Sequence, residues 1–201
     1  MSQYFDEQPS VTSNTKVVDV ALSDVAFTMV TDRGVFSHGH LDAGTSLLLR
    51  AAPPPNPTGN LLDIGCGTGA IAVTLALRSP AATVWATDVN DRARHLTAGN
   101  AERNSVDNIR VVEPDDVPAD VRFTTIWSNP PIRIGKAALH DLLQRWLPRL
   151  TDDGRAVLVV QKHLGADSLQ RWLISEGFEC DRLTSRAGFR LLEVRHTSER
   201  A

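Results

Sequence analysis

The chain alternates short apolar runs with longer amphipathic stretches over most of its length. Its first two apolar runs, at 16–22 and 25–30, are separated by two polar residues and predict a β-hairpin. A glycine-rich turn then leads into a helix expected from about Asp42 to Arg50, with Asp42 as its N-cap. The stretch PPPNPTGN at 53–60 cannot continue either element, so it predicts a break.

After this break, strand patterns alternate with helix patterns. Two final strand patterns follow each other without a helix between them. This order predicts an α/β fold with a mostly parallel seven-stranded sheet and an antiparallel C-terminal hairpin. The expected strands are 61–64, 83–88, 109–113, 123–128, 155–161, 178–184 and 189–195, and the expected helices are 67–79, 90–104, 136–150 and 165–177.

Composition places the chain among ordinary globular proteins. Hydrophobic residues make up 42% and charged residues 22%, and the net charge of −3 argues against a protein that coats nucleic acid by charge alone. Cys66 and Cys180 are too far apart in the sequence to indicate a zinc site or a disulfide framework. No apolar run reaches the roughly 18 residues that span a bilayer, and the polar N-terminus lacks the features of a signal peptide. We therefore expect a cytoplasmic protein.

A glycine-rich turn directly follows the strand pattern at 61–64. Gly65, Gly67 and Gly69 would let the backbone turn tightly and approach a ligand closely. The spacing G-x-G-x-G, with Asp63 two residues before Gly65, differs from the G-x-G-x-x-G of dinucleotide-binding proteins. The turn therefore indicates a nucleotide-like ligand, although a tight strand–helix connection alone also explains glycines here.

Acidic residues follow the next two strand patterns. Asp88 comes nineteen residues after Gly69 and is placed to accept hydrogen bonds from both ribose hydroxyls. Its competing role is to cap the next helix, for which Asn90 also competes. Asp115 or Asp116 could accept a hydrogen bond from an adenine amine, or could belong to a solvated loop. Together, these residues predict an adenosine site.

The fourth strand pattern ends in SNPPIRIGK, residues 128–136. Two prolines stop a strand and stiffen the turn, so Asn129 is held in a fixed place. The lone pair of an aromatic exocyclic amine is delocalised into the ring, which makes the amine a poor nucleophile. The side-chain oxygen of Asn129 and the carbonyl of Pro130 could bind its hydrogens and direct the lone pair at a methyl donor. This chemistry needs no metal.

The combination D-x-G-x-G-x-G, followed about sixty residues later by N-P-P, resembles the class I S-adenosylmethionine-dependent methyltransferases that act on amino groups. The stretch FSHGHLDAGTSLLL, with Asp42 and Gly44, is similar to the segment before the first strand in the "methyltransferase small" family. That family includes enzymes that methylate guanine amines in ribosomal RNA. The resemblance covers roughly residues 17–196 and implies a Rossmann-like class I methyltransferase fold with S-adenosylmethionine as cofactor.

The resemblance also implies domain boundaries and site residues. An extended arm at 1–15 would precede a single methyltransferase domain at 16–201. Within that domain, residues 16–56 form the hairpin and helix, and residues 57–201 form the cofactor-binding core. The implied cofactor-binding residues are Asp63, Gly65, Cys66, Gly67, Gly69, Asp88, Asp115 and Asp116, with Asp42 and Gly44 as further candidates, and the implied catalytic residues are Asn129, Pro130, Pro131 and Ile132.

The chain departs from its relatives at two points. Ile132 stands where many nucleic-acid amino-methyltransferases carry an aromatic residue that stacks on the target base. The two-domain ribosomal RNA guanine enzymes carry an extra N-terminal domain of similar fold, whereas the sequence before the cofactor-binding core predicts only an arm, a hairpin and a helix here. We therefore expect that substrate recognition comes from a small surface or from a dimer, with the protein a monomer or a homodimer. Arg133 and Lys136 are the candidates for contacts with RNA phosphates.

Several activities remain open at this point. The first is methylation of an exocyclic amine of an RNA base, with guanine in the small ribosomal subunit favoured by the resemblance. The second is methylation of a protein glutamine or of adenine in nucleic acid. The third is a ribosome assembly factor that binds the cofactor without turnover. A nicotinamide oxidoreductase is disfavoured by the glycine spacing.

Overall fold

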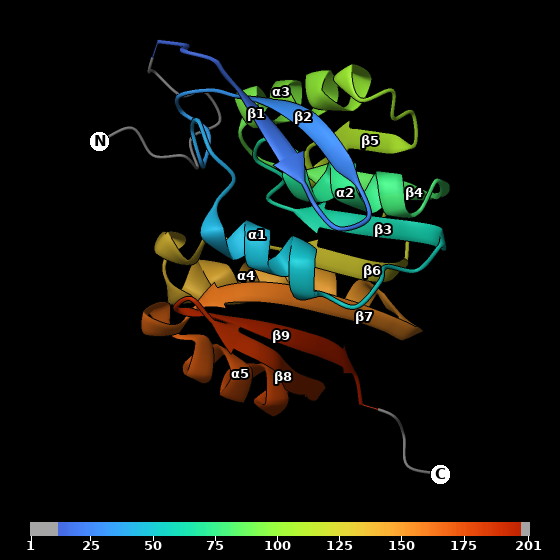
Figure 1. The fold of residues 1–201 in the computed structure, drawn as a ribbon. Coiled ribbons are helices and arrows are strands. Elements are labelled where there is room, and N and C mark those ends of the chain that lie inside the picture. Colours follow the sequence, from blue (N-terminus) through green and yellow to red (C-terminus); the bar gives the residue numbers. More distant parts are fainter. Residues whose placement is uncertain (1–11, 198–201) are drawn as a thin grey trace.

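The computed structural model describes residues 12–197, without the side chain of Arg133. Its centre is a seven-stranded sheet in the order β5-β4-β3-β6-β7-β9-β8 (Figure 1). The strands of this sheet are β3 (Thr58–Ile64), β4 (Ala81–Thr87), β5 (Ile109–Val112), β6 (Phe123–Ser128), β7 (Leu150–Gln161), β8 (Phe178–Arg186) and β9 (Phe189–His196). The helices are α1 (Ala43–Ala51), α2 (Ala70–Arg78), α3 (Asp91–Arg103), α4 (Lys136–Trp146) and α5 (Ala166–Ser175), with short 3-10 helices η1 (Pro114–Asp116), η2 (Ile132–Ile134), η3 (Leu147–Arg149) and η4 (Lys162–Leu164).

The direction of the strands confirms the expected topology. Strands β5, β4, β3, β6 and β7 pair in parallel, whereas β9 is antiparallel to both β7 and β8. The chain moves outward from β3 in one direction through β4 and β5, and then returns to the other side of β3 with β6. In open α/β sheets, this reversal of strand order leaves a crevice at the carboxyl ends of the strands.

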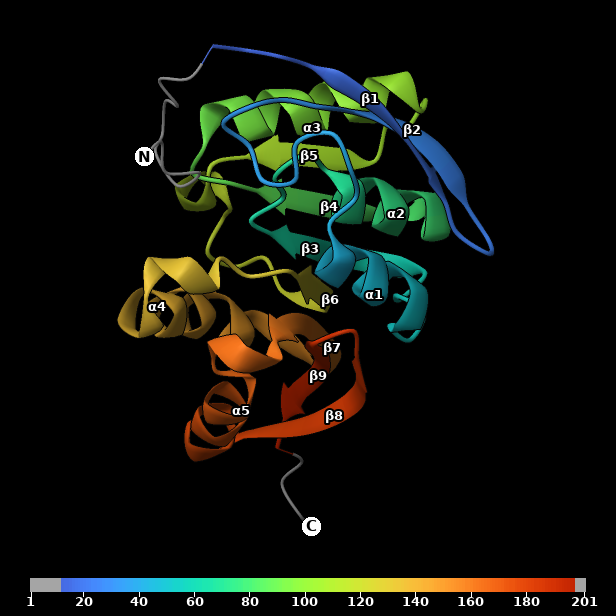
Figure 2. The same cartoon turned by 60° about the vertical axis from the view of Figure 1, so that its left-hand side comes forward.

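Helices cover both faces of the sheet, as the two turned views show (Figures 1 and 2). Successive residues of a strand point to opposite faces, and the buried apolar side chains separate accordingly. Leu61 and Trp127 pack in one cluster with α1 and α2, whereas Leu62 and Ile126 pack in the other with α4 and α5. This explains why the strand patterns of the sequence are continuously apolar rather than alternating.

The N-terminal hairpin joins β1 (Lys16–Ala21) and β2 (Ala26–Thr31), as the sequence predicted. Its apolar face, with Phe27 and Met29, packs on α2 through Ala70 and Val73. The free edge of β2 is paired by the side chains of Asn100 in α3 and of Asn104, the C-cap of α3, rather than by a strand. The amide of Asn104 bonds the N–H and C=O of Thr28 at 3.0 and 2.8 Å, and the amide of Asn100 bonds those of Val30 at 2.7 and 2.9 Å.

This pairing depends on a match between two periods. Residues Asn100 and Asn104 are one helical step of four apart, which is about 6 Å along the axis. Thr28 and Val30 are two strand residues apart, which is about 6.8 Å. The two asparagines therefore imitate a short β-ladder and satisfy backbone groups that would otherwise form an open strand edge.

Several predicted boundaries were wrong, among them the start of α2, which is Ala70 rather than 67. Strand β3 begins at Thr58, inside the expected break, and β7 begins at Leu150 rather than at 155. Helix α4 ends at Trp146 and gives way to η3, because Pro148 supplies no N–H for a further helical bond. Of the predicted arm, residues 1–11 lie outside the described part, and 12–15 have no regular secondary structure. No helix within 12–197 has both the length and the apolar character needed to cross a membrane.

Candidate functional site

A cavity of about 610 Å³ opens at the carboxyl ends of β3, β4 and β6, where the strand order reverses. Its walls come from the loop at 32–42, the glycine loop at 65–69, the β4–α3 turn and the Asn-Pro-Pro turn after β6. Four distant segments of the sequence therefore meet at one site. The predicted site residues in its lining are Asp42, Gly65, Cys66, Gly67, Asp88, Asn129, Pro130, Pro131 and Ile132.

The glycine loop presents its backbone to this cavity. Gly65, Gly67 and Gly69 have φ values of 71°, 56° and 82°, in the left-handed region where glycine is favoured. A Cβ added to Gly65 would meet only Pro131 Cδ, at 4.0 Å, and one added to Gly67 would meet only Val35 Cγ1, at 4.0 Å. The first two glycines therefore border open space, which suits a ligand that lies against the backbone.

Gly69 has a different role from the other two. A Cβ at this position would lie 3.0 Å from the side chain of Thr97 and 3.1 Å from its Cα. The glycine therefore lets α3 pack closely against the start of α2, and it does not line the cavity. Cys66 does line the cavity, but its thiol accepts a hydrogen bond from Thr97 at 3.3 Å, and burial raises the pKa of the thiol well above its usual range. Cys66 is thus a small packed residue rather than a nucleophile.

Asp63 lies beneath the glycine loop and is fully buried. Its Oδ2 accepts a hydrogen bond from Ala72 N at 3.0 Å, whereas Oδ1 has no partner among the described residues. Burial raises the pKa of this carboxyl well above its usual range, and the nearby Asp88 carboxylate adds to the effect. Asp63 therefore links β3 to the first turn of α2 and supports the loop from below.

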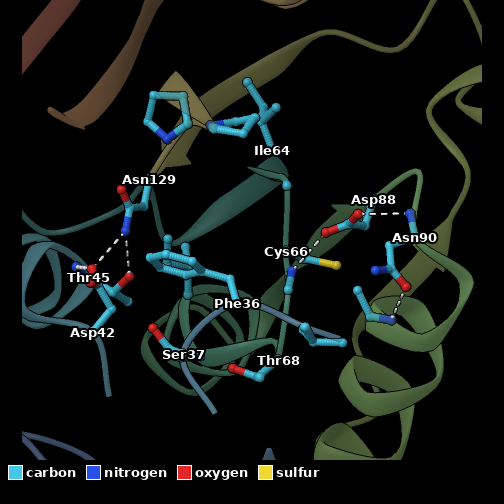
Figure 3. Close-up of a pocket in the computed structure, with 18 of the residues that line it drawn as sticks. Phe36, Ser37, Asp42, Thr45, Ile64, Cys66, Thr68, Asp88, Asn90 and Asn129 are labelled. Atoms are coloured by element: carbon cyan, nitrogen blue, oxygen red, sulfur yellow. Dashed lines mark hydrogen bonds between the residues drawn. The ribbon is translucent and has the colours of Figure 1, made fainter. Parts of the chain in front are cut away.

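Asp88 faces the cavity from the end of β4. Its carboxylate accepts hydrogen bonds from Gly67 N at 3.0 Å and Asn90 N at 2.9 Å (Figure 3). Burial raises the pKa of Asp88, although these N–H groups work in the opposite direction. Asn90, not Asp88, caps α3, since its side chain accepts from Ala93 N at 3.2 Å. Asp88 is consequently not needed for capping.

The turn after β6 is stiff for a specific reason. The carbonyl of Pro130 accepts a hydrogen bond from Ile132 N at 2.8 Å, and Pro131 has φ −74° and ψ 75°. These angles are those of an inverse γ-turn, and the ring of Pro131 holds φ near the value that this turn requires. The Pro130 carbonyl keeps a second lone pair for another donor. Ser128 Oγ donates to Ile64 O at 2.7 Å and ties the turn to the end of β3.

The side chain of Asn129 is held from one end. Its Nδ2 donates to Asp42 Oδ2 at 2.8 Å and to Thr45 Oγ1 at 3.0 Å (Figure 3). Its Oδ1 accepts no hydrogen bond from the described residues, and Asn129 is one of the residues that line the cavity. We call Asn129, Asp42 and Thr45 the amide cluster. Asp42 is also the N-cap of α1, as predicted, because its Oδ2 accepts from Thr45 N at 2.9 Å.

Several predicted site residues lie outside the cavity lining. Gly44 is buried where α1 meets β9, and a Cβ there would lie 2.8 Å from Phe189 Cε1, so this glycine serves packing. Asp115 is exposed and pairs with Arg145 at 2.7 Å, and Asp116 is also exposed, while Pro114 lines the cavity in their place. The structure therefore does not place either acid at the adenosine site that the sequence predicted.

The two predicted RNA-contacting residues lie just beyond the Asn-Pro-Pro turn. Lys136 is exposed at the first position of α4, outside the cavity lining. Arg133 belongs to η2, and its side chain lies outside the described part of the structure. Within 12–197, no group of three or more metal-ligating side chains comes together.

Thr45 and Phe36 also line the cavity; the sequence indicated Phe36 only as the first residue of the family-like stretch FSHGHLDAGTSLLL, and it did not indicate Thr45. Thr45 follows Asp42 by three positions, a spacing that indicates a helix cap but not a contact with Asn129. Phe36 lines the cavity and its side chain is 48% exposed (Figure 3). Its loop is fixed from both sides, since Asn90 Nδ2 donates to Gly34 O at 3.0 Å and Gly39 N donates to Thr31 Oγ1 at 2.8 Å. An apolar residue in a polar loop was a further signal for Phe36.

Comparisons with known proteins agree with this geometry. A family model described as "Methyltransferase small domain" matches residues 26–193. The uncharacterized protein YbxB of Bacillus subtilis (strain 168) is 37% identical over 168 residues, which cover 82% of this chain and 84% of that protein. Ribosomal RNA small subunit methyltransferase C of Pseudoalteromonas translucida (strain TAC 125) is 33% identical over 153 residues, which cover 74% of this chain and 45% of that enzyme.

Among solved structures, the T. thermophilus 16S rRNA N2 G1207 methyltransferase (RsmC), in complex with AdoMet and guanosine, matches with a TM-score of 0.78 and 23% identity. The match covers 94% of this chain and 52% of that one, and it shows a shared fold. The chain thus spans about half the length of the ribosomal RNA methyltransferases that it matches. Because the family model spans most of the sequence, this chain belongs to the methyltransferase small family.

Proposed function

We propose that this protein transfers a methyl group from S-adenosylmethionine to an exocyclic amine of an RNA base, with guanine in small-subunit ribosomal RNA as the favoured target. The observation that carries the proposal is the orientation of Asn129. Its amide nitrogen is bound by Asp42 and Thr45, and its oxygen is left for a ligand in the same cavity that the glycine loop borders. An amine donor needs such an acceptor.

The residues around the glycine loop fit S-adenosylmethionine, which supplies the methyl group when bound. The backbone at Gly65 and Gly67 borders open space, so an extended ligand can lie against it. The Asp88 carboxylate is positioned beside this loop to accept hydrogen bonds from ribose hydroxyls. Val89 is 46% exposed and lines the cavity next to Asp88, where it offers an apolar surface to an adenine.

The Asn-Pro-Pro turn provides the acceptors for the target amine. Asn129 Oδ1 and the second lone pair of the Pro130 carbonyl would each bind one amine hydrogen. Binding both hydrogens draws the amine out of conjugation with the ring and exposes its lone pair. Since the γ-turn at Pro131 is rigid, the acceptors are in place before the substrate arrives. A strong general base is not required, because the amine sheds its proton after methylation.

The rest of the cavity suits a flat base. Phe36 offers a partly exposed aromatic ring, and Ile132 offers an aliphatic surface. Stacking of a base on an aromatic side chain contributes about 1–3 kcal/mol. Phe36 therefore provides the aromatic contact that Ile132 lacks. The target base has to be unpaired or flipped, because its amine is unreachable inside a helix.

The choice of ribosomal RNA rests on the relatives, several of which are named ribosomal RNA small subunit methyltransferase C. Lys136 and Arg133 would contact phosphates beside the site. We further propose that residues 16–201 act as one methyltransferase domain in the cytoplasm, as a monomer or homodimer. The arm at 1–15 stays a prediction.

The test is methyl transfer from radiolabelled S-adenosylmethionine. The acceptors are 30S subunits, 50S subunits, free RNA and ribosomal proteins from a strain that lacks this protein. Asn129→Ala is the test variant, and its kcat should fall roughly 100- to 1,000-fold, in line with the loss of one preorganised polar group at a reacting centre. Gln144→Ala, which removes an exposed amide of α4, is the matched control. Calorimetry should show that Asn129→Ala still binds the cofactor.

Each outcome separates the candidate functions. Label in small-subunit RNA that maps to a guanine and disappears in Asn129→Ala supports the proposal. Label in a ribosomal protein or on adenine moves the function to the alternative N-methyltransferase activities. Bound cofactor without label in any acceptor favours a non-catalytic role in ribosome assembly.

A further inference from the structure

We propose that Asp42 is a positioning residue for catalysis: it fixes which end of the Asn129 amide faces the cavity, and Thr45 helps to hold the amide in place. The inference rests on the proposed function, since it concerns the acceptor for the target amine. The N-terminal end of α1, a helix outside the central sheet, would therefore contribute to catalysis by orienting Asn129.

The two ends of an asparagine amide are nearly equal in size but opposite in hydrogen bonding. If the Asn129 side chain turned over, its NH₂ group would face the cavity and meet the N–H groups of the substrate amine. Two donors would then point at each other, and the amine would not be held. An empty cavity does not favour either orientation of the amide, so the orientation depends on the protein residues that the amide contacts, Asp42 and Thr45.

Asp42 supplies the deciding contact. A carboxylate accepts hydrogen bonds and donates none, so only the NH₂ end of Asn129 can face Asp42 Oδ2 at 2.8 Å. The hydroxyl of Thr45, at 3.0 Å, can accept or donate and therefore adapts to either orientation. In the reversed orientation, the amide oxygen would lie against the carboxylate oxygen, and the hydrogen bond that Nδ2 donates to Asp42 would be lost, whereas the Thr45 hydroxyl could donate to the amide oxygen instead.

The carboxylate is itself held in place before any ligand binds. Its Oδ2 accepts from Thr45 N at 2.9 Å, and the backbone carbonyl of Asp42 accepts from Ser46 N at 2.8 Å. The N-terminus of α1 favours a negative charge at this position. Gly44 keeps the space open, because a Cβ there would lie 3.0 Å from Asp42 Oδ2.

Helix capping alone does not account for this arrangement. Serine, threonine, asparagine and aspartate all cap helices well. A serine hydroxyl, one atom closer to the backbone, would satisfy Thr45 N without reaching Asn129 as Asp42 does. The contact between Asp42 and Asn129 joins positions 87 apart, so it is independent of the local requirement of the helix.

The test therefore separates the role of residue 42 as a helix cap from its hydrogen bond to Asn129. Asp42→Ser keeps a helix cap, but its hydroxyl is too short to contact Asn129 Nδ2. Asp42→Asn keeps the cap and also keeps an oxygen where it can accept from Asn129 Nδ2. At saturating RNA and cofactor, we expect the kcat of Asp42→Ser to be roughly tenfold or more below that of Asp42→Asn, the scale set by one hydrogen bond to a charged group. The cofactor Kd and the melting temperature should be similar in the two variants. Equal kcat values would overturn the proposal.

Thr45→Val is the second variant, because it removes the hydroxyl with little change in shape. Its kcat should fall several-fold below that of Thr45→Ser, which keeps the hydroxyl. If Thr45→Val and Thr45→Ser were equally active, the hydroxyl would have no part in holding the amide.

A readout without methyl transfer keeps this inference separate from the proposed function. The side-chain ¹H–¹⁵N signals of Asn129, assigned by their loss in Asn129→Ala, report the state of the amide directly. In the unmodified protein and in Asp42→Asn, we expect slow hydrogen exchange at this NH₂ group, and in Asp42→Ser faster exchange. Unchanged exchange in Asp42→Ser would overturn the inference even if no RNA substrate had been found.

Discussion

The two sides of the cavity, the glycine loop and the amide cluster, are built from different kinds of groups. The glycine loop at 65–69 uses backbone within a single strand–helix connection, and its partner Asp88 is 21 positions from Gly67. The amide cluster uses the side chains of Asn129, Asp42 and Thr45, and the contacts of Asn129 join positions 87 and 84 apart. The loop side depends on φ values that glycine adopts at no cost, whereas the cluster side depends on how α1 packs against the tip of β6. The loop side joins segments 21 positions apart, whereas the contacts of Asn129 join segments that are 84 and 87 positions apart.

Among changes that leave the amide cluster intact, the largest effect should come from a change on the loop side. Asp88→Ala removes the proposed partner of the ribose hydroxyls, and we expect a net loss comparable to one hydrogen bond to a charged group, about 1.5–3 kcal/mol. We expect the Kd for S-adenosylmethionine to rise roughly 10- to 100-fold in calorimetry, with kcat at saturating cofactor changed far less. Asp91→Ala, a nearby acid outside the cavity lining, is the matched control. A fall in kcat without a change in Kd would place Asp88 on the amine side instead.

A second change probes the space between the two sides. Phe36→Ala should raise the KM for RNA roughly 5- to 50-fold, because stacking on an aromatic ring contributes about 1–3 kcal/mol. Steady-state kinetics with RNA as the varied substrate measures this effect. Phe36→Tyr retains the ring and should stay close to the unmodified protein. If the cofactor Kd rose and the KM for RNA did not, Phe36 would be covering the cofactor.

A smaller effect should come from the packing of α1 behind the amide cluster. Gly44→Ala adds a methyl group 2.8 Å from Phe189 Cε1 and 3.0 Å from Asp42 Oδ2. Overpacking costs about 1–3 kcal/mol, and the better helix propensity of alanine returns about 0.5–1 kcal/mol. We expect a net loss of about 1 kcal/mol in denaturant unfolding and a several-fold lower kcat.

A second substitution, at Phe189, tests whether the stability lost in Gly44→Ala comes from crowding between these two residues. Phe189→Leu makes room beside position 44, so the double variant should recover much of the stability lost in Gly44→Ala, as a double-mutant cycle would show. Strict additivity of the two changes would mean that the clash with Phe189 is not the cause.

The smallest effect concerns the carboxyl beneath the glycine loop. Burial raises the pKa of Asp63 above its unfolded value of about 3.9. Ionisation therefore costs the folded state stability as the pH rises from the unfolded pKa through the folded one. Asp63→Asn escapes this loss, so its melting temperature relative to the unmodified protein should rise with pH above about 4.

Differential scanning fluorimetry of the cofactor-free protein at several pH values measures this difference. Asp181→Asn, which removes an exposed carboxylate from β8, controls for the change in net charge. A difference in melting temperature that stays constant with pH would mean that Asp63 does not titrate abnormally.

The contrast between the two sides also explains what the sequence could predict. The topology and the glycine loop were predictable because each rests on patterns within one element or one turn. The position of Asn129 was predictable because two prolines leave the chain little freedom. The link from Asp42 to Asn129 was not, since a helix cap looks the same whether or not it touches a distant residue.

Other mismatches have similar causes. Asp115 and Asp116 were expected at the adenine, but the short helix η1 turns them to the surface and brings Pro114 to the cavity. The direction of side chains in a single 3-10 turn depends on its exact start, which composition does not reveal. Asn100 and Asn104 look like ordinary helix-surface residues in the sequence, and only the placement of the hairpin shows that they pair with β2.

The pairing of β2 by these asparagines has a consequence for the chain while it is being made. Thr28 leaves the ribosome 76 residues before Asn104, its hydrogen-bond partner. At a synthesis rate of about 5–20 residues per second, the nascent hairpin waits roughly 4–15 s for the helix that closes its edge. During that interval, the edge of β2 that Asn100 and Asn104 later pair stays open, and the later helix ends this exposure.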